Sequence, residues 1–134
     1  FSTCTPDKLY FPVDTDQGRI TVEAQQKDPQ SLLQFVRGII HLRHSSAALR
    51  NSGIWTLLSD ERKPYPMVYS RSSSDETYIV AINPSAQTVK AVIASQEGKT
   101  KVAPDTQKAS YKSGSAGDVI KLNGISAVIY RINK

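Results

Sequence analysis

The sequence of 134 residues is poor in the groups that most often carry covalent, metal or redox chemistry. Cys4 is the only cysteine, so an intramolecular disulfide and a zinc site of the multi-cysteine kind are both excluded. The longest apolar runs, as at residues 78–82, are far shorter than the roughly 20 residues that cross a bilayer. No glycine-rich phosphate loop, nucleophile elbow or metal-spaced cluster occurs. We therefore expect no cofactor, no metal ion and no membrane as a partner.

Side chains that could do acid–base work are present, but their surroundings favour structural roles. Two candidate pairs of carboxylates, Asp14 with Asp16 and Asp60 with Glu61, lie in polar turns, where solvated acids are common. His41 falls on the polar side of a predicted helix, and His44 near its end is favourably placed in the helix dipole. Cys4 has no histidine beside it and is a poor nucleophile. We predict no catalytic residue in this chain.

Positive charge is concentrated toward the C-terminus without forming a nucleic-acid site. The net charge is +5, and residues 96–134 hold seven Lys/Arg against three Asp/Glu. The lysines are spread through a stretch rich in glycine, serine and threonine, with no arginine cluster and one aromatic residue, Tyr111. A solvated loop explains this pattern better than a basic patch, so we expect no nucleic-acid partner.

One strongly amphipathic helix is predicted over residues 28–45. Asp28 suits the N-cap and Pro29 suits the first helical position, where its missing N–H is not needed. At 100° per residue the apolar side chains gather on one broad flank, which we predict to be a domain interface formed by Leu32, Leu33, Phe35, Val36, Ile39 and Ile40. Such a flank does not stay in water. We expect it to pack on the strands that follow, on structure outside this chain, or on a second copy.

Beyond residue 50 the sequence is typical of an antiparallel β domain. Short β-rich runs separated by turn residues are predicted to be strands at residues 54–58, 67–71, 77–83, 88–94, 119–122 and 127–132. Such a series favours a sandwich or a barrel over a parallel sheet. Residues 96–118 are expected to hold one or two edge strands. The predicted fold is mainly β, preceded by an irregular segment and one amphipathic helix.

Three aromatic residues near the start of the β region are candidates for binding sugar. Trp55, Tyr65 and Tyr69 are close in sequence, and flat rings on a β-sandwich can stack on sugar rings. The alternative is that Trp55 anchors the first strand against the core or the helix, which is the commoner role of a lone aromatic residue near a domain start.

Several runs resemble glycoside hydrolase family 13. Because the chain opens on Phe1 and its only methionine is Met67, we expect it to be a piece of a longer protein. The run from Val22 to Arg43 resembles the last helix of the catalytic barrel in α-glucosidases, oligo-1,6-glucosidases and trehalose synthases of this family. The stretch Leu9–Val13 resembles the loop after the eighth barrel strand. Residues 78–84 and 125–132 resemble strands of the C-terminal β-sandwich.

The resemblance implies a non-catalytic role. In this family the nucleophile, the acid/base and the second aspartate lie on earlier barrel strands, upstream of Phe1, so none can be carried onto this chain. It implies that residues 1–50 are a remnant of the barrel and that residues 51–134 form the C-terminal sandwich, of the type found in α-amylases. The expected function is to stabilise the catalytic barrel of an enzyme that acts on α-glucans. The alternative is a carbohydrate-binding module that contacts an α-glucan through Trp55, Tyr65 or Tyr69. Compartment, bond specificity and reaction type are left open.

Overall fold

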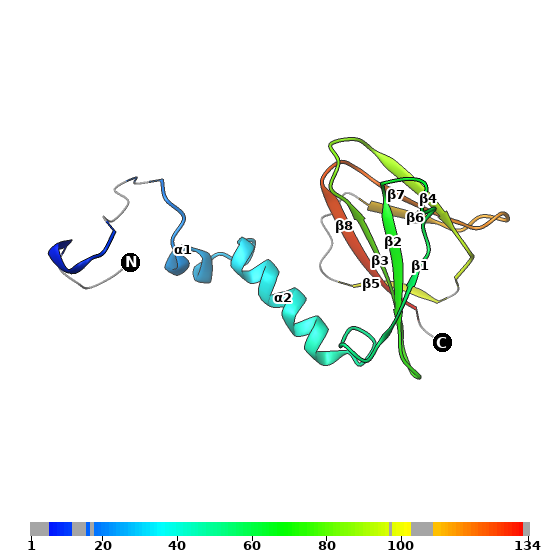
Figure 1. Ribbon diagram of the computed structural model, residues 1–134, viewed down its shortest axis with the longest axis horizontal. Helices are drawn as coiled ribbons and strands as arrows, with labels where there is room; N and C mark the ends of the chain where they lie inside the picture. Colours follow the sequence, from blue (N-terminus) through cyan, green and yellow to red (C-terminus); the bar gives the residue numbers. More distant parts are fainter. Residues whose placement is uncertain (1–5, 12–15, 17, 97, 103–108, 133–134) are drawn as a thin grey trace. The chain divides into compact units, whose positions relative to one another are not determined.

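The computed structural model describes residues 6–11, 16, 18–96, 98–102 and 109–132. The chain divides into two compact units, Phe1–Arg37 and Gly38–Lys134. The first holds a 3₁₀ turn, η1 (Pro6–Lys8), a short helix, α1 (Val22–Lys27), and the beginning of a longer helix, α2 (Leu32–Ser45). The second holds the rest of α2 and the eight strands (Figure 1).

The predicted start of the long helix is wrong, because Asp28 closes one helix and does not open the next. Thr21 caps α1 by accepting a hydrogen bond from the Ala24 N–H at 3.1 Å, and the Asp28 N–H donates to the Ala24 carbonyl. The Asp28 side chain then accepts from the Gln30 N–H at 2.8 Å, in a turn typical of aspartate. A stretch predicted to be irregular up to residue 27 therefore contains α1.

Ser31 is the residue that opens α2. Its hydroxyl accepts from the Gln34 N–H and donates to the Gln25 carbonyl at 2.6 Å, so it joins the two helices of the first unit. Serine is a strong N-cap because its oxygen satisfies an amide that the first turn leaves without a partner. The sequence analysis named Asp28 as the N-cap, and the structure uses Ser31, three residues later.

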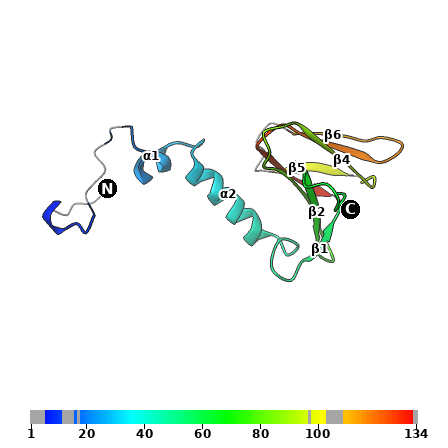
Figure 2. The same ribbon diagram turned by 45° about the horizontal axis from the view of Figure 1, so that its top comes forward.

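The second unit is an antiparallel β-sandwich, as predicted. Its strands are β1 (Ile54–Leu57), β2 (Met67–Ser72), β3 (Thr77–Asn83), β4 (Val89–Ile93), β5 (Lys99–Val102), β6 (Ala109–Lys112), β7 (Asp118–Leu122) and β8 (Ser126–Ile132). One sheet has the order β1-β2-β3-β8-β5 and the other the order β4-β7-β6, with every pair antiparallel. Figure 2 shows β4 and β6 in a layer separate from β1 and β2.

The core lies between the two sheets. Its buried apolar side chains come from alternate positions of the strands, as half-buried antiparallel strands require; they are Val68, Ile79, Ala81, Ala91, Ile93, Ile120, Leu122, Val128 and Tyr130. Polar side chains are buried beside them, among them those of Asn83 and Asp118. Asn83 donates to the Gln87 and Asn123 carbonyls, and Asp118 accepts from the Tyr111 hydroxyl at 2.7 Å.

Residues 96–118, predicted to hold one or two edge strands, contain β5 and β6 among the residues that the structure describes. β5 pairs with β8 at one edge of the five-stranded sheet, and β6 pairs with β7 at one edge of the three-stranded sheet. Residues 103–108 between them lie outside the described residues. The six strands predicted from turn spacing agree with the structure to within one residue at each end.

Candidate functional site

The five-stranded sheet has a second apolar face, opposite the core. Side chains of paired residues point to the same side of a sheet, so the register defines this outer face. One row across all five strands is apolar throughout: Leu57, Tyr69, Val80, Ile129 and Val102. The next row adds Met67, Ile82 and Ala127. We call these eight residues together with Trp55 the outer face. Trp55 is 48% exposed and Met67 is 40% exposed.

Two of the three predicted sugar-contact residues lie together on the outer face. The ring centroids of Trp55 and Tyr69 are 6.0 Å apart with an angle of 33° between the ring planes. Tyr65 is exposed and lies in the turn before β2, outside the strands. The two rings are tilted against each other, and Tyr69 continues into an aliphatic row. Sugar contact by these residues stays a prediction.

The apolar flank of α2 is accessible to solvent. Leu32 is 70% exposed, Ile40 is 50% exposed and Val36 is 41% exposed. Phe35 is also exposed, Leu33 and Ile39 are half-buried, and α2 has no buried residue. The role of this flank as a domain interface stays a prediction.

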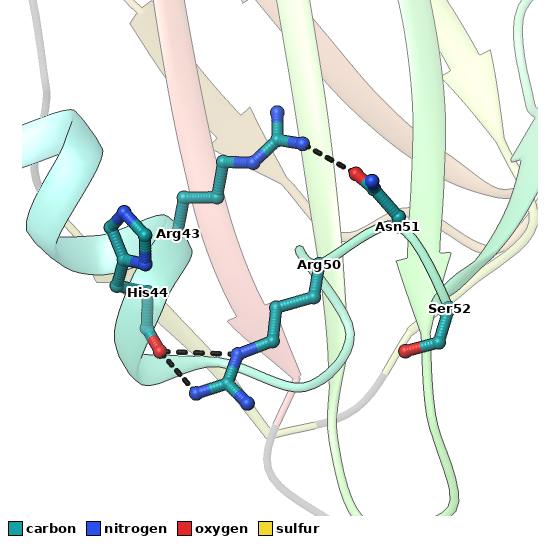
Figure 3. Close-up of a pocket in the computed structure, with 5 residues that line it drawn as sticks. All are labelled: Arg43, His44, Arg50, Asn51 and Ser52. Atoms are coloured by element: carbon teal, nitrogen blue, oxygen red, sulfur yellow. Dashed lines mark hydrogen bonds between the residues drawn. The ribbon is translucent and has the colours of Figure 1, made fainter.

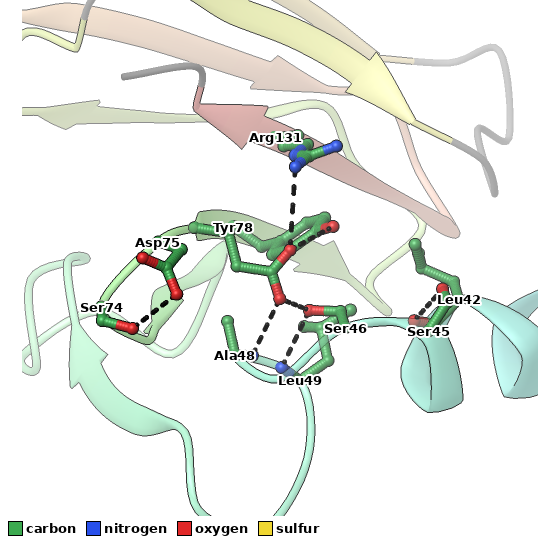
Figure 4. Close-up of polar contacts among 10 residues, drawn as sticks. Leu42, Ser45, Ser46, Ala48, Leu49, Ser74, Asp75, Tyr78 and Arg131 are labelled. Carbon is green, nitrogen blue, oxygen red and sulfur yellow. Dashed lines mark hydrogen bonds and ion pairs between the residues drawn. The ribbon is translucent and has the colours of Figure 1, made fainter.

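The carboxylate of Glu76 holds the turn that follows α2 against the sheet, and Figure 4 labels its partners Ser46, Ala48, Tyr78 and Arg131. One oxygen of Glu76 accepts from the Ser46 hydroxyl at 2.5 Å and from the Ala48 N–H at 3.1 Å. The other oxygen accepts from the Tyr78 hydroxyl at 3.2 Å and lies 3.9 Å from a guanidinium nitrogen of Arg131. Ser46 and Ala48 are buried as a result. We call this arrangement the Glu76 clasp.

The clasp depends on the ionised form of Glu76. Burial by itself would raise the pKa of this carboxyl, but the hydrogen bonds from Ser46, Ala48 and Tyr78 outweigh it, so the pKa lies below its ordinary value. Sequence reasoning missed the clasp because Ser46 and Glu76 are 30 residues apart and neither forms a motif. Arg71 supports the same turn by donating to the Ala48 and Arg50 carbonyls.

Beside the clasp lies an open hollow of about 500 Å³ (Figure 3). Its lining residues are Arg43, His44, Arg50, Asn51 and Ser52. Arg43 donates to the Asn51 side-chain oxygen at 2.8 Å, and Arg50 donates twice to the His44 carbonyl at 2.6 and 3.2 Å. His44 thus lies in the last turn of α2, where a structural role was predicted.

Two of the carboxylates considered from the sequence, Asp60 and Asp16, lie among the residues that the structure describes. Asp60 is exposed in a turn, and the hydrogen bond from Arg62 lowers its pKa. Asp16 accepts from the Gly18 N–H, while Asp14 and Cys4 lie outside the described residues. Within the ranges that the structure describes, no three His, Cys, Asp or Glu side chains gather as a metal site would require. No helix in those ranges has the length and apolar character to span a membrane.

Comparisons with known proteins point to one group of enzymes. No family model matches the chain. An oligo-1,6-glucosidase from Heyndrickxia coagulans is 30% identical over 89 residues, which are 66% of this chain and 15% of that protein. The fold matches an isomaltulose synthase from Erwinia rhapontici with a TM-score of 0.71 at 22% identity, over 93% of this chain and 22% of the synthase. It matches an α-amylase from H. orenii with a TM-score of 0.66 at 16% identity, over 84% of this chain and 22% of the amylase.

These matches define the class of protein. The fold is the antiparallel β-sandwich that glycoside hydrolase family 13 enzymes carry as a C-terminal domain. The resemblance stated from the sequence is confirmed, and this chain belongs with the C-terminal part of glycoside hydrolase family 13 enzymes. It spans only 15–22% of the proteins that it matches.

Proposed function

We propose that this chain is a non-catalytic C-terminal segment of an α-glucan-active enzyme and that it stabilises the catalytic barrel of that enzyme. The outer face of the five-stranded sheet is the observation that carries the proposal. Antiparallel sheets that meet water usually alternate between apolar and polar side chains, whereas strands covered on both sides are apolar throughout. β3 has the second pattern, with Tyr78, Ile79, Val80, Ala81 and Ile82 in succession.

The outer face and the apolar flank of α2 are the two surfaces that the barrel would cover. Contiguous apolar surface of this extent marks an interaction site in a soluble protein. Burying it against the helical layer of a barrel removes apolar area from water and so stabilises both partners. The proposal also accounts for the matched proteins, which include a glucosidase, an amylase and an isomaltulose synthase by name. A domain that supports the barrel can serve all three chemistries.

Substitutions in the longer enzyme test the proposal. Val36→Ser on α2 and Met67→Ser on the outer face should each lower the temperature of thermal unfolding, because each places a polar group in a buried interface. The turnover number at a low temperature should be unchanged. The matched controls are Arg37→Ser and Lys90→Ser, which alter exposed polar positions. If both apolar substitutions behave like their controls, the barrel does not cover these surfaces and the proposal fails.

A carbohydrate-binding role is the second candidate, favoured by the exposed Trp55–Tyr69 pair. Two neighbouring rings can stack on successive glucose units. Titration of the 134-residue chain with maltoheptaose, followed by the fluorescence of its single tryptophan, separates the candidates. Saturable quenching that is lost in Tyr69→Ala favours binding, while a flat titration favours the supporting role.

A further inference from the structure

The hollow at the end of α2 is a cationic site with no acid in its lining. Arg43, His44 and Arg50 contribute its charged or titratable groups, and Asn51 and Ser52 contribute neutral polar ones. The carboxylate that holds the same turn, Glu76, accepts hydrogen bonds from Ser46, Ala48 and Tyr78 in the clasp. The hollow therefore has the charge that attracts an anionic group and holds none of its own.

Hydrogen bonds hold the guanidinium groups of Arg43 and Arg50 in place, and both groups retain N–H donors that a ligand could use. Among the residues that the structure describes, Asn51 is the hydrogen-bond acceptor for Arg43, and it takes one of five N–H donors. Arg50 is held by the carbonyl of His44, at the end of α2 where a cation is favoured by the helix dipole. Figure 3 shows the two side chains reaching to opposite ends of the turn. A planar group held in this way can bind a carboxylate through two parallel hydrogen bonds.

Arg43 also continues the apolar stripe of α2. It follows Ile39 by four residues and Val36 by seven, so the three lie on the same side of the helix. A surface that covers Val36 and Ile39 will therefore also cover Arg43. Covering an arginine without a partner is strongly unfavourable, because the charge loses its hydration and receives nothing in exchange.

We propose that an aspartate or glutamate of the catalytic barrel occupies this hollow and pairs with Arg43. The inference rests on the proposed function, since it names the chemistry of the partner on the surface that α2 is proposed to meet. The apolar flank would supply most of the binding energy, and the pair would set the register of the helix against the barrel. A barrel surface with no aspartate or glutamate at this point would pack unfavourably on α2, because it would cover Arg43 without a partner.

Zero-length cross-linking in the longer enzyme tests the proposal. Arg43→Lys places a primary amine in the hollow, and a carbodiimide joins an amine to a carboxylate only where the two are in contact. We expect one cross-linked peptide that joins position 43 to an acidic residue outside residues 1–134. Arg37→Lys, on the polar side of α2, is the matched control and should yield none. No cross-link at position 43, or one to an acid within residues 38–134, overturns the proposal.

Arginine reactivity supplies a second measurement in the unaltered protein. Phenylglyoxal should modify Arg43 severalfold more slowly in the longer enzyme than in the 134-residue chain, while Arg37 should react equally in both. Equal rates for Arg43 overturn the proposal. Protection of Arg43 in the 134-residue chain by inorganic phosphate would identify a free anion as the occupant, which also overturns it.

The outcome separates the two hypotheses. If Val36→Ser destabilises the enzyme but Arg43 is unprotected, only the carboxylate partner is wrong. If Val36→Ser and Met67→Ser are both neutral, the supporting role itself fails, whatever the behaviour of Arg43.

Discussion

The two faces of the five-stranded sheet are built from the same strands but have different surroundings. On the inner face, Val68, Ile79 and Val128 are at most 1% exposed because the three-stranded sheet covers them. On the outer face, Met67 is 40% exposed although its row, with Ile82 and Ala127, is as apolar, and Trp55 is 48% exposed. Both faces carry the composition of a protein interior. An apolar pattern in the sequence therefore identifies surfaces that other protein atoms should cover. Only the structure shows which of these surfaces this chain covers itself.

The largest difference between the faces should appear on truncation of single side chains. Ile79→Ala removes fully buried methyl groups from the core and should lower the free energy of unfolding of the 134-residue chain by about 2–5 kcal/mol. Met67→Ala on the outer face should cost well under half as much, since its side chain already meets solvent. Urea unfolding followed by circular dichroism measures both. Equal losses of unfolding free energy in the two variants would mean that the outer face is covered within this chain. The two faces would then not differ in their surroundings.

The second test concerns the Glu76 clasp, which lies at the polar edge of the outer face. Glu76→Gln should lower the free energy of unfolding at neutral pH by about 1–3 kcal/mol, because hydrogen bonds to a charged group are lost or weakened. Glu23→Gln is the matched control; Glu23 pairs with Lys27 at 2.7 Å but is 78% exposed, so its loss should be nearly neutral.

The same variant should alter the pH dependence of stability. The pKa of Glu76 in the folded chain lies below its ordinary value of 4.5, so its contribution is complete above that value. It is lost as the pH falls from there through the lower pKa of the folded state. The unaltered chain should therefore lose stability on acidification over this range more steeply than Glu76→Gln. Parallel curves would show that the clasp contributes nothing to folding.

The smallest expected effect concerns α2, the other uncovered apolar surface. Gly38 lies in the middle of the helix, and a Cβ added there would meet no atom within 4 Å. Gly38→Ala should therefore stabilise the 134-residue chain by about 0.5–1 kcal/mol, through helix propensity and reduced freedom of the unfolded chain. Thermal unfolding measures the change. A loss of stability in the longer enzyme, with a gain in this chain, would show that the barrel approaches the helix backbone at Gly38.

Much of the sandwich was predictable because its signals are local. Turn residues such as Asn123 and Gly124 separate strands whose side chains alternate, and the strands at residues 89–93 and 126–132 follow that pattern closely. The helix boundary was not predictable in the same way. Asp28 and Ser31 are both good caps, and the choice between them depends on the contact of Ser31 with Gln25 in α1.

The sequence by itself determined the β-rich class, the amphipathic character of α2 and the family likeness, because each of these depends on residues that are near neighbours along the chain. The tertiary structure alone decided three things: that Trp55 lies against Tyr69 of an apolar row, that Glu76 fixes the turn after α2, and that Arg43 and Arg50 border one hollow. Each of these depends on strand register or on contacts between distant residues. Spacing along the chain does not encode such contacts, because the energy that selects them arises only when the sheets have paired and packed.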